Sequence, residues 1–515
     1  MPVTRRAAAP LTFIPTAYSP WVMRMIHWVL PILLRVRIRP WLPAGISRIE
    51  VKQVERLVKL YAELEAGKSR FLMAVRHVEV DDPLTGLYLC SRAVKRAAKA
   101  EGISLRQPIH THFLYERGMT IWAGKGLGWM LSRIGGVPIR RGRRPDWVGL
   151  KAARKLMTQG SMPMVVAPEG ATNGHSERLG PLEPGVAQLG FWCAEDLQRD
   201  RRSEKVFIVP IGIQYRYEQA YWPQLQTLLT RLEKESGLSS EEQFACSLAP
   251  TADKDCYLRI LRLGIYLMAK MEAFYARFYQ YAYESKDESQ TENQAESKNE
   301  NKNKSQTADS EKLSYVEIAD LDPANYSDRL RALLDGALKV AEQFFNLPSK
   351  GTVVDRCRRI EEASWQVIYR EDLPELSTLS PFERGLTDWA AQEASLRELH
   401  MRVVESFVAA DGEYLKEKPS FERCAEMAML MFDLVTKLGD RTSILKLDSI
   451  LKLDIKGRGT GRPRLGKRWV TMTVQPPICV SDRLADYQQN RRAGRIAVAD
   501  LTEAIRQSLE ETIER

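Results

Sequence analysis

The sequence has no long uninterrupted apolar stretch. Residues 7–34, the most apolar part of the N-terminal region, are broken by prolines and an arginine: Pro10, Pro15, Pro20, Pro31 and Arg24. A membrane-spanning helix needs about 20 predominantly apolar residues in a row. A secretion signal needs an unbroken apolar part followed by small residues. We therefore expect neither a spanning helix nor a signal peptide in this region.

Closely spaced cysteines are also missing. The seven cysteines are scattered without a Cys-x-x-Cys motif, which favours reduced thiols and a cytosolic protein over a disulfide framework. His110 and His112 would share one face of a strand, but no cysteine or carboxylate stands at ligand spacing. Residues 125–128, Lys-Gly-Leu-Gly, lack the spacing of a nucleotide-binding loop. The sequence predicts no metal site and no bound cofactor.

Acidic residues are in the minority. The chain holds 76 Lys and Arg against 66 Asp and Glu, a formal net charge of +10. No nucleic-acid-binding signature accompanies this balance, so no nucleic-acid partner is predicted. An anionic membrane surface and anionic substrates explain it equally well. With 515 residues, the chain exceeds one ordinary core and predicts two or more folding units.

Between about residues 49 and 212, helical and strand patterns alternate. Apolar runs predict strands at residues 71–75, 109–114, 162–167 and 206–213, with another around Arg141. Helical spacing predicts helices at residues 50–64, 93–100, 127–134, 147–157 and 186–197. This alternation indicates an α/β fold, in which a mixed, mostly parallel sheet is flanked by helices. Ligands of such folds bind at loops that follow the strands.

A histidine and two carboxylates follow the first of these strands. Residues 76–83 read Arg-His-Val-Glu-Val-Asp-Asp-Pro. Histidine has a pKa near neutral pH and can act as a general base on a hydroxyl group. A carboxylate, Asp81 or Asp82, can accept the proton of one ring nitrogen of His77, so that the other nitrogen takes the hydroxyl proton. The competing interpretation is a surface histidine in an acidic loop.

A glycine turn that ends in arginine comes next. Residues 135–141 read Gly-Gly-Val-Pro-Ile-Arg-Arg. The glycines allow a tight turn and close approach to a ligand, and the guanidinium of Arg141 can bind a phosphate bidentately. The pattern predicts an anion-binding arginine. The alternative is a solvated basic loop over residues 140–144.

Two further patterns complete the series. Residues 165–170 read Val-Val-Ala-Pro-Glu-Gly and place Pro168, Glu169 and Gly170 at a strand end, where they can line a polar pocket. Residues 206–213 are a continuous apolar run, which is typical of a buried parallel strand.

The four patterns, in this order, resemble the glycerolipid acyltransferases, whose best-known members are the 1-acylglycerol-3-phosphate acyltransferases. That family shows His-x-x-x-x-Asp, a glycine-rich segment ending in arginine, Phe-Pro-Glu-Gly-Thr-Arg, and an apolar strand ending near proline. The resemblance covers residues 50–215 and selects Asp82 over Asp81. It implies two catalytic residues, His77 and Asp82, and five substrate-binding residues, Arg141, Pro168, Glu169, Gly170 and Pro210.

This chain departs from the family pattern in three places. Residues 171–173 read Ala-Thr-Asn where the family continues Thr-Arg, Ala167 stands where phenylalanine is common, and Arg76 stands where asparagine commonly precedes the histidine. An arginine associated with the acceptor phosphate is therefore missing, and Arg178 is a candidate to replace it. These departures do not change the predicted reaction class, but they leave the identity of the acceptor open.

The resemblance also suggests a domain organisation. Residues 469–478 resemble the strand and turn that close many family domains, ahead of a last helix predicted at 501–513. We expect four parts: an N-terminal membrane-contacting segment (1–49), an acyltransferase domain (50–215), a mostly helical insertion (216–465), and a closing strand and helix (466–515). Within the insertion, residues 285–312 hold almost no apolar residue and are predicted to be disordered. The competing interpretation is a separate C-terminal domain.

The N-terminal segment combines tryptophans with arginines: Trp21, Trp28, Trp41, Arg35, Arg37 and Arg39. This combination is typical of a segment that lies in the lipid headgroup region. The alternative is a terminus packed on the body of the protein.

Together, the residues and the resemblance predict an enzyme peripheral to the cytosolic face of a membrane. It would transfer a fatty acyl group from acyl carrier protein or coenzyme A to the hydroxyl of a lysophospholipid, above all 1-acylglycerol-3-phosphate, giving phosphatidic acid. The alternatives are another lysolipid acceptor, or a catalytically silent membrane-binding scaffold built on the same fold.

Overall fold

A computed structural model describes most of the chain: residues 6–36, 45–120, 125–140, 146–238, 251–281, 323–370, 372–373, 375–407, 412–438 and 463–514. The described residues form two compact units. The first, a sheet unit, holds those between Leu11 and Glu218 and those from Lys467 onward. The second, a helical unit, holds those up to Pro10 and those between Gln219 and Gly466.

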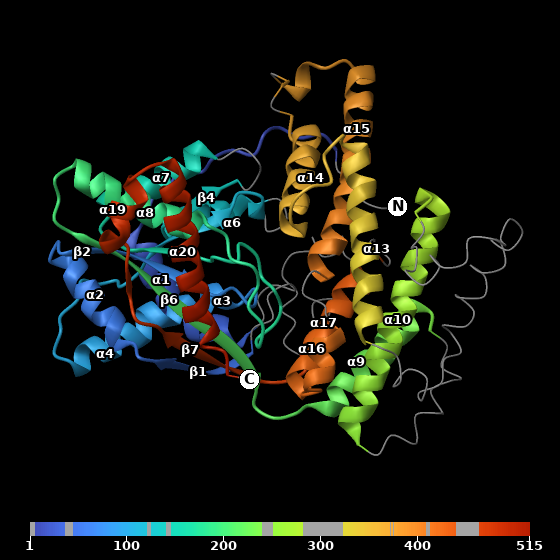
Figure 1. The fold of residues 1–515 in the computed structure, drawn as a ribbon, viewed down its shortest axis with the longest axis horizontal. Helices are drawn as coiled ribbons and strands as arrows, with labels where there is room; N and C mark the ends of the chain where they lie inside the picture. Colours follow the sequence, from blue (N-terminus) through green and yellow to red (C-terminus); the bar gives the residue numbers. More distant parts are fainter. Residues whose placement is uncertain are drawn as a thin grey trace, which may run out of the picture. The chain divides into compact units, whose positions relative to one another are not determined.

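The sheet unit is built on one eight-stranded sheet with the order β1-β7-β6-β2-β5-β3-β4, in which β8 also pairs with β6 (Figure 1). The strands are β1 (Ile46–Lys52), β2 (Ser69–Val75), β3 (His112–Glu116), β4 (Gly136–Ile139), β5 (Met164–Val166), β6 (Lys205–Tyr217), β7 (Arg468–Val474) and β8 (Ile478–Cys479). Most neighbours are parallel, and β6 is antiparallel to β7 and β8. The predicted α/β fold with a mixed, mostly parallel sheet is therefore confirmed.

Helices cover both faces of this sheet because its central strands are apolar on both sides. In β2, Phe71 and Met73 face one core, and Leu72 and Ala74 face the other. The first core is covered by α1 (Pro20–Arg35), α2 (Glu55–Glu65), a π-helical turn (Leu89–Val94) and α4 (Lys95–Ala100). The second is covered by α7 (Trp147–Gln159), α8 (Gly185–Arg199) and α20 (Arg491–Glu510). The unit also contains α3 (Asp82–Tyr88), α6 (Lys125–Arg133) and α19 (Leu484–Gln488).

Several predicted element boundaries are wrong, and the last helix, expected at residues 501–513, spans Arg491–Glu510. The helix expected from residue 50 begins at Glu55, because residues up to Lys52 continue β1. Ile49 and Val51 alternate there with exposed Arg48, Glu50 and Lys52, the period-two pattern of a strand. The strand expected at 109–114 begins at His112, and β4 ends at Ile139, before Arg141.

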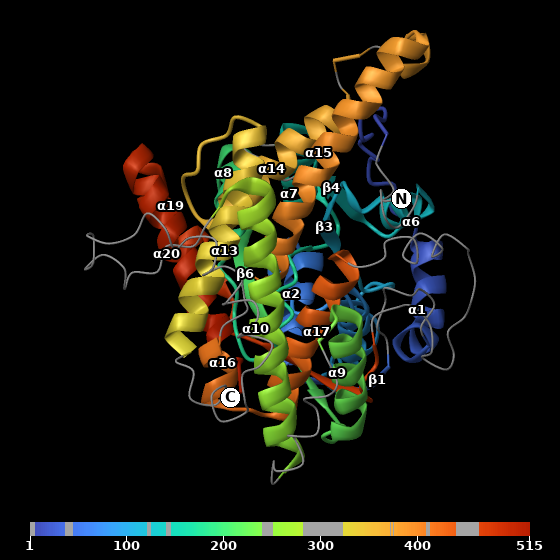
Figure 2. The ribbon, with the colours of Figure 1, turned by 90° about the vertical axis from the view of Figure 1, so that its right-hand side faces the viewer.

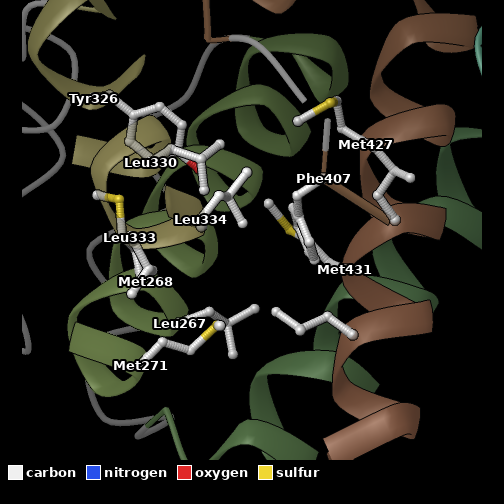
Figure 3. Close-up of a pocket in the computed structure, with 13 residues that line it drawn as sticks. Leu267, Met268, Met271, Tyr326, Leu330, Leu333, Leu334, Phe407, Met427 and Met431 are labelled. Atoms are coloured by element: carbon white, nitrogen blue, oxygen red, sulfur yellow. The ribbon is translucent and has the colours of Figure 1, made fainter. Parts of the chain in front are cut away.

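The helical unit contains α9 (Trp222–Ser236), α10 (Ala252–Tyr279), α13 (Pro323–Phe344), α14 (Val353–Ile368), a 3-10 turn (Leu376–Thr378), α15 (Pro381–Phe407), α16 (Gly412–Glu417) and α17 (Phe421–Leu438). The long helices α10, α13 and α15 run alongside one another (Figures 1 and 2). An apolar pocket lies among α10, α13, α15 and α17, and four methionines line it with Tyr326 and Phe407: Met268, Met271, Met427 and Met431 (Figure 3). The segment predicted to be disordered, 285–312, lies outside the described residues.

The polypeptide leaves and re-enters the sheet between two neighbouring strands. Tyr217, at the end of β6, pairs with Arg468, at the start of β7, and the N–H of Glu218 donates to the carbonyl of Lys467 over 3.0 Å. β7 then lies between β1 and β6. Among the described residues, no helix has the length and apolar character to cross a membrane.

Candidate active site

The site forms where β2 ends and α3 begins. His77 follows β2, and Asp82 is the first residue of α3. The Nδ1 atom of His77 lies 2.9 Å from Oδ2 of Asp82, and the same oxygen accepts from the N–H of Glu79 over 3.0 Å. The Asp82 side chain is buried, while that of His77 retains 27% exposure. A buried carboxylate thus holds an imidazole that solvent and ligands can reach.

Tyr215, on β6, fixes the other carboxylate oxygen. Its hydroxyl donates to Oδ1 of Asp82 over 2.6 Å. Burial, followed by the charges of Asp82 and Asp81, raises the pKa of Tyr215 well above its usual value. The phenol therefore stays protonated and remains a donor. Each oxygen of Asp82 has its own partner, so the carboxylate cannot rotate away from His77 without breaking a hydrogen bond.

We expect Tyr215→Phe to reduce the turnover that depends on His77 by about tenfold, because hydrogen bonds to charged groups contribute about 1.5–3 kcal/mol. The change should act on kcat and leave KM for either substrate nearly unaltered, since the hydroxyl points at Asp82. Steady-state kinetics on the purified variant test this. An unchanged kcat would show that Asp82 needs no second anchor.

The neighbouring carboxylate, Asp81, has a different partner. Asp81 is fully buried, and its Oδ2 accepts from Nη2 of Arg468 over 2.8 Å. Nη1 of Arg468 lies 3.4 Å from Glu79, and the guanidinium stacks 4.9 Å from the ring centre of Tyr215. Burial alone would lower the pKa of Arg468, but Glu79 and Asp81 outweigh it and raise that pKa. The structure thus assigns the two aspartates different tasks, with Asp82 on the histidine and Asp81 on the arginine of β7.

Glu169 holds the loop that faces His77. Its Oε2 accepts from the N–H of His77 over 2.7 Å, and its Oε1 accepts from the N–H of Gly180 and from Nδ2 of Asn173, each over 2.8 Å. Burial raises the pKa of this carboxyl, while Arg76 and the backbone donors oppose the rise. The described contacts give Glu169 a positioning role toward His77. Its predicted contact with substrate stays a prediction.

Pro168 and Gly170 flank Glu169 in a tight turn. Gly170 has a φ of +73° and its N–H donates to the carbonyl of Ala167 over 3.2 Å. Side chains other than glycine rarely adopt this backbone conformation. Pro168 is buried, and its carbonyl accepts from the N–H of Glu183 over 2.7 Å. This turn places the Glu169 carboxylate next to the backbone N–H of His77.

Arg76, which departs from the family pattern, is a buried clamp on the same loop. Its guanidinium donates to the carbonyls of Ser176 (2.6 Å), His175 (2.8 Å) and Ile213 (3.3 Å), and to that of Arg178. It is 1% exposed. Sequence reasoning missed this role, although an arginine that ends an apolar strand was a signal for it.

The remaining predicted substrate residues are placed unevenly. Arg141 lies outside the described residues. Just before it, the N–H of Arg140 donates to Oδ2 of Asp146 over 2.9 Å, and Asp146 also pairs with Arg117. Pro210 is buried in β6 beside Ala74 of β2, and its carbonyl accepts from the N–H of Gln475 over 2.9 Å.

His112, the first residue of β3, and His110, which precedes the strand, both contact backbone carbonyls. Nε2 of His110 lies 2.7 Å from the carbonyl of Ile134, and Nδ1 of His112 lies 3.1 Å from that of Gly135. Burial lowers the pKa of His110 to about 3, so its ring is neutral. Within the described part of the chain, no group of three or more His, Cys, Asp or Glu side chains could hold a metal ion.

Part of the chain is similar to a known protein family. Residues 48–214 match a family model whose description is Acyltransferase. The matched segment contains the predicted site residues, the loop held by Glu169, and β6 up to the residue before Tyr215. No curated protein matches the chain.

Proposed function

Because residues 48–214 match an acyltransferase family model, we propose that this protein transfers a fatty acyl group from a thioester to a glycerolipid hydroxyl. The donor is acyl carrier protein or coenzyme A, and the preferred acceptor is 1-acylglycerol-3-phosphate, which becomes phosphatidic acid. The observation that carries the proposal is the 2.9 Å contact between His77 and Asp82. The protein would act as a peripheral enzyme at the cytosolic face of a membrane.

The reaction follows from the chemistry of the pair. With Nδ1–H donating to Asp82, Nε2 of His77 takes the proton of the acceptor hydroxyl while its oxygen attacks the thioester carbonyl carbon. The tetrahedral intermediate then collapses, and the C–S bond breaks. The imidazolium returns its proton to the departing thiolate, so that the products are an ester and a free thiol. Asp82 stabilises the positive charge on the imidazolium, and no bound cofactor takes part.

Acceptor binding is assigned to the residues that the family resemblance implies. Arg141 would bind the acceptor phosphate through its planar guanidinium, and Pro168 to Gly170 would shape the acceptor side of the pocket. Pro210 would line the acyl chain. Thr172 stands where the family has a second arginine, which leaves room for an acceptor with a different head group.

We expect Arg141→Ala to raise KM for a phosphate-bearing acceptor by about tenfold or more, because a charge-assisted hydrogen bond contributes about 1.5–3 kcal/mol. The KM for the acyl donor should not change. Arg144→Ala is the matched control, since it removes an equal charge from the same basic run. Equal effects of the two substitutions on KM would show that Arg141 only adds to the net charge.

The proposed function is tested with labelled acyl-acyl carrier protein and acyl-coenzyme A, each offered with a panel of lysolipids. The panel contains 1-acylglycerol-3-phosphate, lysophosphatidylethanolamine, lysophosphatidylglycerol and a lysoglycolipid. A labelled diacyl product formed by the wild type and lost in His77→Ala supports the proposal and identifies the acceptor. If no acceptor yields product with either donor, the protein is a silent scaffold on this fold.

A further inference from the structure

Helix α1 has two apolar faces, and only one of them is covered by the parts of the chain that the structure describes. Met23, Leu30 and Leu34 are buried in the sheet unit. On the other face, four large apolar residues recur at spacings of four, three and four residues: Trp21, Met25, Trp28 and Ile32. Trp21 is 66% exposed and Trp28 is 79% exposed. We call these four residues the α1 stripe. Large contiguous apolar surface on a soluble protein marks an interaction site.

A third exposed tryptophan lies on the element next to α1. The N–H groups of Ala17 and Ser19, just before the helix, donate to the carbonyls of Ser132 and Arg133 at the end of α6. Trp129, one turn earlier on α6, is 55% exposed, and the Arg133 guanidinium lies 5.8 Å from its ring centre. The hydrogen bonds fix the start of the α1 stripe beside α6.

The charges around the stripe identify its partner. Residues 1–49 contain no Asp or Glu, whereas Arg24 and Arg35 are exposed on α1 itself. Tryptophan rings prefer the boundary between lipid headgroups and acyl chains, and nearby arginines attract anionic headgroups. A stripe of tryptophans and aliphatic side chains, flanked by cations without a carboxylate, matches an anionic bilayer.

We propose that the α1 stripe docks the protein onto an anionic lipid bilayer. The buried side of α1 packs on α3, the helix that begins with Asp82, and Nη2 of Arg92 donates to the carbonyl of His27 over 3.0 Å. Docking through α1 therefore keeps the His77–Asp82 pair close to the lipid from which an acceptor is drawn. The benefit to catalysis rests on the proposed function, but docking is a property of α1 alone and is measured without transfer.

Sedimentation with vesicles tests the proposal. Wild-type protein is mixed with phosphatidylcholine vesicles, with and without phosphatidylglycerol, and the bound fraction is measured. Trp21→Ala/Trp28→Ala removes two rings that are seven positions apart on α1. Phe382→Ala/Trp389→Ala is the matched control, because these residues are equally spaced on α15, in the helical unit, and are 75% and 63% exposed. Arg24→Glu/Arg35→Glu keeps the four residues of the α1 stripe and reverses the charge of the two arginines on the same helix.

Wild-type protein should bind the phosphatidylglycerol vesicles more strongly than pure phosphatidylcholine. The α1 double variant should lower this partitioning by about tenfold or more, because interfacial binding scales with the apolar area buried, and the α15 variant should leave it unchanged. The charge-reversed variant should lose the preference for phosphatidylglycerol. His77→Ala should bind as the wild type does, so a failure of catalysis cannot be mistaken for a failure of docking.

Two outcomes would overturn the proposal. One is equal vesicle binding by the wild type and the α1 double variant. The other is wild-type protein that binds no vesicles and self-associates through α1, which would make a second copy the partner. Circular dichroism of each variant establishes that it is folded, as the exposure of both replaced tryptophans leads us to expect.

Discussion

Replacing His77 by alanine should reduce acyl transfer by about 10²–10⁴-fold, the contribution typical of general-base catalysis. The loss should fall on kcat, because the imidazole acts on the proton of an acceptor that is already bound. Its side chain is partly exposed, so we expect the thermal stability to change little. Transfer at the wild-type rate would remove His77 from the mechanism.

The adjacent aspartates provide the control for this result. Asp82→Asn keeps the shape of the side chain but allows an amide to face Nδ1 of His77, which stabilises the wrong tautomer. It should lower kcat nearly as far as His77→Ala does. Asp81→Asn, one residue away, touches Arg468 instead of the imidazole. Its folded fraction should retain most of the transfer rate, and equal kinetic losses in the two variants would contradict the division of roles.

The second large effect is expected in stability. Arg468→Met should destabilise the sheet unit by about 3–5 kcal/mol, because it leaves the buried carboxylate of Asp81 without its cation. Glu79 would lose the same partner, and the methionine cannot replace the stacking on Tyr215. Urea unfolding, followed through loss of the His77-dependent activity, reports on this unit.

Two further variants isolate the cause. Arg468→Met/Asp81→Asn removes both charges and should recover part of the loss, since an uncompensated buried charge costs more than a missing pair. Arg506→Met removes an exposed arginine, paired with Glu503 on α20, and should leave the unfolding midpoint unchanged because exposed pairs contribute little. A midpoint shift in Arg506→Met as large as that of Arg468→Met would point to net charge as the cause.

The sequence predicted the part of the candidate site in which residues close together in the chain contact one another. The family resemblance selected Asp82 over Asp81 as the partner of His77, and the structure contains that contact. Alternating helical and strand patterns predicted the fold class. The prediction of a helix at residues 50–52 failed, because a short run of alternating apolar and polar residues fits both a strand and the first turn of a helix. The alternation of Ile49 and Val51 with charged residues indicates the strand, and the pairing with β7 carries it on to Lys52.

The hydrogen bonds that hold the site residues in place could not be predicted, because they join distant parts of the chain. Arg76 reaches Ser176 across 100 residues, Asp82 meets Tyr215 across 133, and Asp81 meets Arg468 across 387. Each contact depends on the order of strands in the sheet. A residue type alone cannot specify such a partner, so Arg76 looked like a deviation and Tyr215 like an ordinary strand residue.

The pairing of Tyr217 with Arg468 has a consequence for how the protein folds. Closing a loop costs more entropy as the loop lengthens, and contacts between distant residues slow folding. If the helical unit folds first and keeps its two ends close together, it connects β6 and β7 as a short hairpin turn would. The entropy cost of closing the long loop between these strands is then no longer part of forming the sheet. β7 then pairs with β6 only after the helical unit is complete, so a defect in those helices delays assembly of the sheet without changing any residue in it.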